Sequence, residues 1–232
     1  MGHELGALER ALGITFRDRS LLSQALVHRS YLNENPDSHL QSNERLEFLG
    51  DAVVDALTAD YIFRNYPEKG EGEMTLLRSA LVRTETLARF AQELKLGQFL
   101  LLGRGEESDN GRERPSILAD AFEALVGAIY LEAGLECARA FVTRFLEAEA
   151  KRWQGRLPLD FKSALQIEIQ GRYNRTPEYR TLASWGPDHA RTFRVEVRVG
   201  SEVLGVGEGP SKQAAQQEAA RQALEALRSR GP

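Results

Sequence analysis

The sequence predicts an all-α domain followed by a small α+β domain with the element order α-β-β-β-α. Apolar residues recur with helical spacing from Leu8 to about Leu146, and no alternating β-branched run interrupts them. Apolar and polar residues first alternate strictly at 193–200, which is typical of a half-buried strand. An Ala- and Gln-rich run at 211–227 then restores helical spacing. This change of texture indicates two domains of different class.

The first domain, assigned to residues 1–150, is expected to consist of helices joined by short connectors. Helices are predicted at 20–30, 43–66, 74–94, 117–133 and 135–149. The connectors contain residues that end helices or cannot continue them, namely Pro36, Pro67, Gly70, Gly72, Gly111 and Pro115.

The second domain is expected at residues 160–229. Before it, helical spacing lapses at 151–159, where Gly155 and Pro158 favour a linker. The predicted elements are a helix at 160–173, strands at 178–184, 193–199 and 201–206, and a helix at 211–227. Ala215, Ala219, Ala220 and Leu224 are expected to face the sheet.

Composition excludes several classes of protein. With 232 residues, 42% hydrophobic and 28% charged, the chain can build a large core but carries too many charges for a bilayer. No window approaches the roughly 18 apolar residues of a membrane span, and no signal-peptide core is found. The single Cys137 cannot form an internal disulfide, so we expect a reducing, cytoplasmic compartment and no membrane association.

The charge is distributed unevenly along the chain. Residues 151–232 carry 14 Lys and Arg against 9 Asp and Glu, a net +5, whereas residues 1–150 carry a net −9. A basic second part is typical of a module that holds a polyanion. The first part must tolerate or need its surplus of carboxylates.

Acidic side chains gather on one part of the predicted helix at 43–66. On a helical wheel they stand apart from its apolar stripe, and they are Glu44, Glu47, Asp51 and Asp55. Because Glu47 and Asp51 are four residues apart, they repel each other unless a cation lies nearby.

A second acidic pair, Asp120 and Glu123, shares one face of the helix at 117–133. If the two helices pack with these edges facing, Glu47, Asp51, Asp120 and Glu123 form a cluster of oxygen ligands. Mg²⁺ and Mn²⁺ prefer such ligands, whereas zinc prefers Cys and His.

Structural interpretations of these residues stay open from the spacing alone. An acidic helix face is commonly just solvated, and His28 is more often a hydrogen-bonded packing residue than a ligand. Gly50 costs about 1 kcal/mol against Ala within a helix, and one reason to keep it is the close approach of a neighbour.

The string NERLEFLGDAV at 43–53 resembles the signature of the ribonuclease III family. Three further segments resemble other motifs of the family and occur in the same order. They are LLSQALVHRS at 21–30, LRSALV at 77–82 and SILADAFEALVGAIYLEAG at 116–134. The tail resembles the double-stranded-RNA-binding domain of bacterial members. The resemblance spans essentially the whole chain and implies an all-α endonuclease domain followed by that RNA-binding domain.

The resemblance implies a divalent-metal-dependent endoribonuclease that cuts double-stranded RNA as a homodimer. Such enzymes leave 5′-phosphate and 3′-hydroxyl ends with short 3′ overhangs, and they process rRNA, mRNA and other structured RNAs. The residues that match the family's metal ligands are Glu47, Asp51, Asp120 and Glu123. Glu44 and Glu71 match further acidic positions of the site.

RNA contacts are expected on three parts of the tail, because duplex RNA is recognised by shape through hydroxyl and phosphate contacts. They are Ser163 and Gln166 on the first helix, the 186–189 loop with His189, and Ser211 and Lys212 at the start of the last helix. Ile167 and Gln213 depart from the family pattern. Gln213 replaces a common basic residue, so we expect weaker phosphate contact at this helix.

Phe48 lies between Glu47 and Leu49, off the apolar stripe of its helix. Large exposed apolar groups tend to mark interfaces, and the resemblance implies that the matching residue inserts into a partner subunit. The alternative is that Phe48 packs on another helix of its own chain.

Two other functions remain open from the residues alone. A protein that binds duplex RNA without cutting it is favoured if one of the four carboxylates is replaced, and none is. A scaffold with a helical interaction domain offers no reason for acids on two separate helices to converge.

Overall fold

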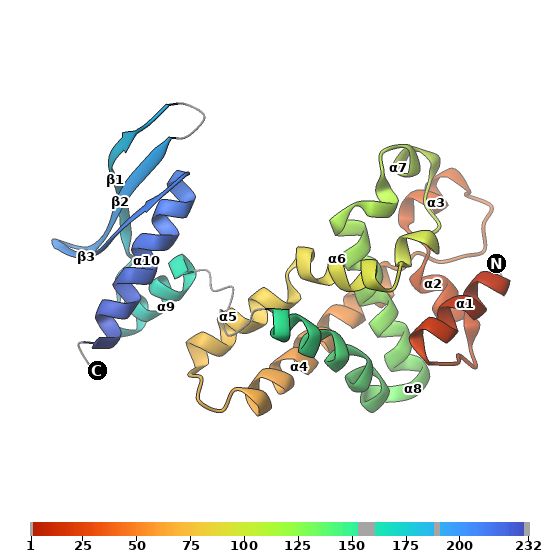
Figure 1. The fold of residues 1–232 in the computed structure, drawn as a ribbon. Helices are drawn as coiled ribbons and strands as arrows, with labels where there is room; N and C mark the ends of the chain where they lie inside the picture. The colour runs from red at the N-terminus through yellow and green to blue at the C-terminus, as the bar shows by residue number, and fades with distance from the viewer. Residues whose placement is uncertain (1, 153–160, 188–190, 230–232) are drawn as a thin grey trace. The chain divides into compact units, whose positions relative to one another are not determined.

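The computed structural model describes residues 2–152, 161–187 and 191–229 (Figure 1). The chain divides into two compact units, Met1–Pro67 with Arg78–Leu157 and Glu68–Leu77 with Pro158–Pro232. In the described part of the chain, no helix has the length and apolar character needed to cross a membrane.

Up to Arg152 the described chain is helical, as predicted. The α-helices are α1 (Gly2–Leu12), α2 (Arg19–Ala25), α3 (Arg29–Glu34), α4 (Glu44–Asn65), α5 (Glu71–Val82), α6 (Thr84–Glu93), α7 (Arg104–Ser108) and α8 (Pro115–Arg152). The prediction of continuous helices at 20–30 and 74–94 was wrong, because each run is broken in the middle.

The first break separates α2 from α3. Residues 26–28 are drawn into a parallel bridge in which Val27 pairs with Leu101. The amide of Leu101 donates to the carbonyl of Leu26 at 2.8 Å, and the amide of His28 donates to the carbonyl of Leu101 at 3.1 Å. A distant segment therefore takes the hydrogen bonds that a continuous helix would have used.

The second break separates α5 from α6 at Arg83, whose backbone is extended. The hydroxyl of the buried Thr86 donates to the carbonyl of Ala80 at 2.9 Å. The Thr86 hydroxyl therefore satisfies one of the carbonyls that the end of α5 leaves without an intrahelical partner.

Helix α8 bends at Gly134, whose φ of 81° lies outside the helical region. The two predicted helices at 117–133 and 135–149 are its two halves. The first half is buried over most of its length and packs against α4 and α6. Around it the rings of Phe90, Phe122, Phe141 and Phe145 form an aromatic cluster with centroids 5.2 to 5.9 Å apart.

The second part of the chain has the predicted α-β-β-β-α order. Its elements are α9 (Phe161–Tyr173), β1 (Glu178–Trp185), β2 (Thr192–Val199), β3 (Glu202–Gly209) and α10 (Lys212–Ser229). The strands form one antiparallel sheet in the order β1-β2-β3 (Figure 1). Helix α10 lies very close to β3, since a Cβ atom added to Gly207 would be 2.1 Å from the backbone nitrogen of Ala219.

The core of this second part joins both helices to the sheet. Its buried residues include Leu165 and Ile169 of α9 and Val197 of β2. The predicted sheet-facing residues of α10, Ala215, Ala219, Ala220 and Leu224, are all buried.

Candidate functional site

Two glycines bring α4 and α8 into backbone contact. A Cβ atom added to Gly50 would lie only 1.8 Å from the carbonyl oxygen of Glu123, and one added to Gly127 would lie 2.4 Å from that of Leu46. Only a residue without a side chain fits at either position. The expectation that Gly50 admits a close neighbour is confirmed, and the neighbour carries one of the predicted acids.

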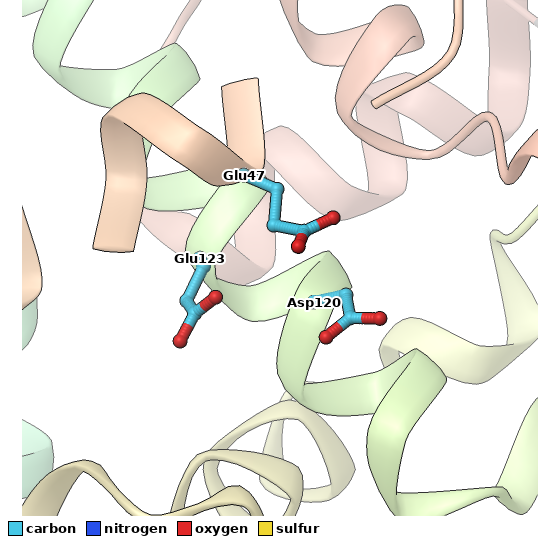
Figure 2. A group of neighbouring side chains, drawn as sticks. All are labelled: Glu47, Asp120 and Glu123. Carbon is cyan, nitrogen blue, oxygen red and sulfur yellow. The ribbon is translucent and has the colours of Figure 1, made fainter. Parts of the chain in front are cut away.

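Three carboxylates converge beside this crossing. Glu47 comes from α4, and Asp120 and Glu123 come from consecutive turns of α8 (Figure 2). One oxygen of each lies within 4.8 Å of the others, and all three side chains are half-buried. The structure therefore brings acids from two separate helices together, which the helical spacing had left conditional on how the two helices pack.

The electrostatics of the cluster are unfavourable without a cation. Burial and the neighbouring charges of Asp51, Asp120 and Glu47 raise the pKa of Glu123 to about 8. The pKa of Asp120 is raised by burial, and that of Glu47 is raised by burial and by Asp120. Desolvated like charges favour the protonated form, so the ionised cluster needs a positive charge.

The cluster fits a hard divalent ion. Its three side chains offer only carboxylate oxygens, the ligands that Mg²⁺ and Mn²⁺ take, and no His or Cys belongs to the group as described. A cation at this point would oppose the repulsion that raises the pKa of Glu123.

The other predicted acids lie outside this group of three. Asp51 is exposed one turn after Glu47, and its charge is the largest electrostatic influence on Glu123 after burial. Glu44 is exposed, accepts from the Ser42 hydroxyl at 2.8 Å and lies 3.8 Å from Arg29.

Glu71 opens α5 in the segment Glu68–Leu77, which groups with the second unit. Its carboxylate is exposed and accepts from the Thr75 hydroxyl at 3.5 Å. Glu71 is therefore not one of the three converging carboxylates.

A polar cavity of about 400 Å³ adjoins the cluster. Its lining residues are His28, Arg29, Asn43, Glu44, Glu47, Glu106, Arg114, Ser116, Ile117 and Asp120. The sequence interpretation treated His28 as a packing residue and did not consider Arg29. The sequence shows them only as a consecutive His-Arg pair at 28–29, and this spacing alone does not indicate that the pair lies beside the acidic helix.

His28 caps α3 with its own side chain. Its Nδ1 accepts from the amide of Ser30 at 3.3 Å and lies 2.8 Å from the Ser30 hydroxyl oxygen. Burial lowers the pKa of His28, which favours the neutral form of the ring. The packing interpretation is therefore confirmed for one of its two ring nitrogens.

The predicted RNA contacts lie on exposed parts of the second unit. Ser163 and Gln166 share one exposed face of α9. Ser211 caps α10, because its hydroxyl oxygen accepts from the amide of Ala214 at 3.1 Å, and Lys212 next to it is exposed. His189 lies outside the described residues.

Phe48 projects from α4 with 82% of its surface exposed. The alternative that it packs within its own chain was therefore wrong. It borders a mainly apolar groove of about 630 Å³. The groove is lined by Leu21, Gln24, Gln41, Glu44, Arg45, Leu46, Phe48, Leu49 and Leu131.

Comparison with known proteins places both parts of the chain. Residues 18–149 match a ribonuclease-III-like family, and residues 161–227 match the double-stranded RNA binding motif. Ribonuclease 3 from a Roseiflexus species is 51% identical over 98% of this chain and 97% of its own length. Ribonuclease 3 from Chloroflexus aggregans is 48% identical over 97% of this chain and 98% of its own length. The nuclease domain of ribonuclease III from Campylobacter jejuni is 44% identical with a TM-score of 0.56, over 61% of this chain and 94% of that domain.

A helical nuclease domain with an acidic cluster, followed by a double-stranded RNA binding motif, defines an enzyme that cuts duplex RNA. The chain belongs to the ribonuclease III family. Its enzymes are endoribonucleases specific for double-stranded RNA, as the resemblance implied.

Proposed function

We propose that this enzyme hydrolyses phosphodiester bonds of double-stranded RNA with divalent ions held by Glu47, Asp51, Asp120 and Glu123. Mg²⁺ is the proposed cofactor and Mn²⁺ its substitute, and the proposed products have 5′-phosphate and 3′-hydroxyl ends with short 3′ overhangs. The observation that carries the proposal is the convergence of three half-buried carboxylates, in which the pKa of Glu123 reaches about 8.

Each carboxylate contributes a different property to the site. A bound divalent ion supplies Lewis acidity that lowers the pKa of water and stabilises negative charge on the phosphodiester oxygens. Glu123 is the most perturbed acid and must lose its proton to act as an ionised ligand. Asp51 is exposed and can reach an ion from the solvent side. Asp51 and Glu123 are the proposed catalytic pair. Glu47 and Asp120 complete the proposed set of metal ligands. Glu44 and Glu71 are proposed as accessory acids.

The enzyme is proposed to act as a homodimer, because cleavage of both strands needs two sites. Phe48 is proposed as the anchor, since its exposed ring stands beside an apolar groove that a partner's ring can fill. The Campylobacter jejuni nuclease domain has a region involved in dimer formation, which supports the same assembly here.

The second domain is proposed to hold the duplex, with boundaries of 1–150 for the nuclease domain, 151–159 for the linker and 160–229 for the RNA-binding domain. The amino-terminal end of α10, with Lys212, is suited to phosphate because free backbone amides and the helix dipole favour anions. Ser163, Gln166, Ser211 and His189 are the further proposed contacts. Structured RNAs such as rRNA and mRNA precursors in the cytoplasm are the proposed substrates.

The test is cleavage of an end-labelled RNA duplex in Mg²⁺, Mn²⁺, Ca²⁺ or EDTA. We expect cleavage in Mg²⁺ and Mn²⁺ only, and near-complete loss of it in Glu123→Gln and Asp51→Asn with duplex binding retained. Glu113→Gln removes an exposed acid outside the cluster and should cleave normally. Cleavage by Glu123→Gln or Asp51→Asn near the parental rate would show that the metal ligands are wrongly assigned.

A further inference from the structure

The polar cavity beside the acidic cluster contains the groups that can receive the RNA backbone. The cluster repels a phosphate wherever no cation screens it, so the cavity needs donors or positive charges of its own. Arg114 is already engaged, because its guanidinium pairs with Glu106 at 2.6 Å and with Asp109 at 2.5 Å. Arg29 is exposed and only loosely paired with Glu44, at 3.8 Å. The guanidinium group of Arg29 is therefore available to bind a ligand.

The hydrogen bonds of His28 fix which of its ring nitrogens carries the hydrogen. The hydroxyl oxygen of Ser30 accepts from the amide of Gly103 at 2.9 Å, so its own hydrogen can point to Nδ1 of His28. The amide of Ser30 also donates to this nitrogen. Because Nδ1 accepts, the hydrogen of the ring sits on Nε2. Among the described residues no hydrogen bond to Nε2 is found, and this donor is left for a ligand.

The backbone around His28 is held in place from both sides. Its amide donates to the carbonyl of Leu101, and the amide of the buried Asn43 donates to the carbonyl of Val27 at 2.8 Å. Asn43 directly precedes α4, which carries Glu47. His28 is therefore positioned by the same contacts that position the start of the acidic helix, and it lines the same cavity as Asp120. A donor fixed in this way needs little reorganisation when a substrate binds.

We propose that the Nε2–H group of His28 donates a hydrogen bond to a non-bridging phosphate oxygen of the RNA strand at the acidic cluster, with the charge of Arg29 beside it. His28 is thus a phosphate-binding residue of the nuclease site. The inference deepens the proposed function and rests on it.

The variant His28→Asn separates this role from the structural one. The side-chain oxygen of Asn lies near the position of Nδ1 and can still accept from the amide of Ser30, and Asn is a favourable N-cap residue. The shorter side chain lacks any group at the place of Nε2. His39→Asn changes an exposed histidine that does not line the cavity, so it is the matched control.

Cleavage is measured under single-turnover conditions with enzyme in excess over a labelled duplex. We expect His28→Asn to cleave about 10 to 100 times more slowly, because a hydrogen bond to a charged group is lost. Duplex affinity should stay within about twofold, since contacts to many phosphates outside this cavity supply it. The unfolding temperature should match that of His39→Asn, which shows that the cap is intact.

Sulfur substitution of single non-bridging oxygens identifies the contact itself. Phosphorothioates are placed one at a time at and next to the cleaved bond, and the reactions are run in Mn²⁺, which tolerates sulfur better than Mg²⁺. We expect one position at which sulfur slows the parental enzyme but has no further effect on His28→Asn. This non-additivity between the sulfur substitution and the His28→Asn substitution is expected of a direct contact, and a merely structural role of His28 would not produce it.

Three results would overturn the inference. Parental cleavage rates in His28→Asn would show that the Nε2 donor is not used. Sulfur effects of equal size in both proteins at every position would show that His28 touches no phosphate. These results leave the proposed function intact provided that Glu123→Gln is inactive, whereas a parental enzyme that does not cut duplex RNA would overturn both.

Discussion

The substitution Gly50→Ala tests the claim that the site depends on backbone contact between α4 and α8. The added Cβ atom would lie 1.8 Å from the carbonyl oxygen of Glu123, so the two must separate by about 1.6 Å to reach an ordinary 3.4 Å contact. The obstructing atoms belong to the backbone of α8 and not to a flexible side chain. Overpacking of this kind costs about 1 to 3 kcal/mol or more. Alanine regains about 1 kcal/mol of helix propensity. We expect a net loss of about 2 kcal/mol in the free energy of unfolding.

The matched control is Gly6→Ala in α1, where the added Cβ atom meets nothing closer than the flexible end of Arg10 at 3.7 Å. This variant should be neutral or more stable by up to about 1 kcal/mol. Scanning calorimetry of the whole chain measures both variants, with the expected loss of Gly50→Ala in the transition of the nuclease domain.

Cleavage provides a second measurement of the same substitution. A separation of this size moves Glu47 away from Glu123, and a misplacement of about 1 Å can cost about 100-fold in rate. We expect Gly50→Ala to cleave duplex RNA at least about 100-fold more slowly at temperatures where it remains folded. A variant as stable and as active as the parental enzyme would refute the helix crossing as the origin of the site.

Two further predictions concern the dimer and the pH dependence of stability. Phe48→Ala should weaken the dimer by about 2 to 4 kcal/mol and lower cleavage as monomer accumulates; an unchanged dissociation constant by sedimentation would remove Phe48 from the interface. The pKa of Glu123 is about 8 when folded against 4.5 as the ordinary value, so between these pH values the folded state holds a proton that the unfolded state has lost. Stability in EDTA should therefore fall as the pH rises from 4.5 to 8, and less steeply in Glu123→Gln; equal slopes for the two proteins in EDTA would contradict the perturbed pKa.

Much of the fold follows from local periodicity. The alternation at 193–199 and the Ala-rich run after Ser211 correspond to β2 and α10 within one or two residues. The two broken helices were not predictable in the same way. Residues 26–28 leave the helix because Leu101 pairs with them, and that partner lies more than 70 positions away in the sequence. Helical spacing in a single segment carries no information about such a partner.

The candidate site, like the fold, could be predicted from the sequence only in part. The helical wheel predicted that Glu47 shares a face with Asp51, and that Asp120 shares one with Glu123. It could not predict that Glu47 would meet the second pair while Asp51 remains exposed, because this depends on where α4 crosses α8. The role of His28 could not be predicted for a related reason. Its Nδ1 is bonded to Ser30, whose hydroxyl oxygen accepts from the amide of Gly103, and Gly103 comes from another part of the chain.

The crossing collects several features that oppose folding. Gly50 and Gly127 each cost about 1 kcal/mol within their helices, and the acids beside them are half-buried like charges. A packing role alone would be served better by two alanines at a slightly wider helix spacing. The narrow spacing becomes useful only when oxygens from two helices must meet at one point. Features that lower the stability of the fold are expected to collect at a functional site, because binding of the ligand requires them.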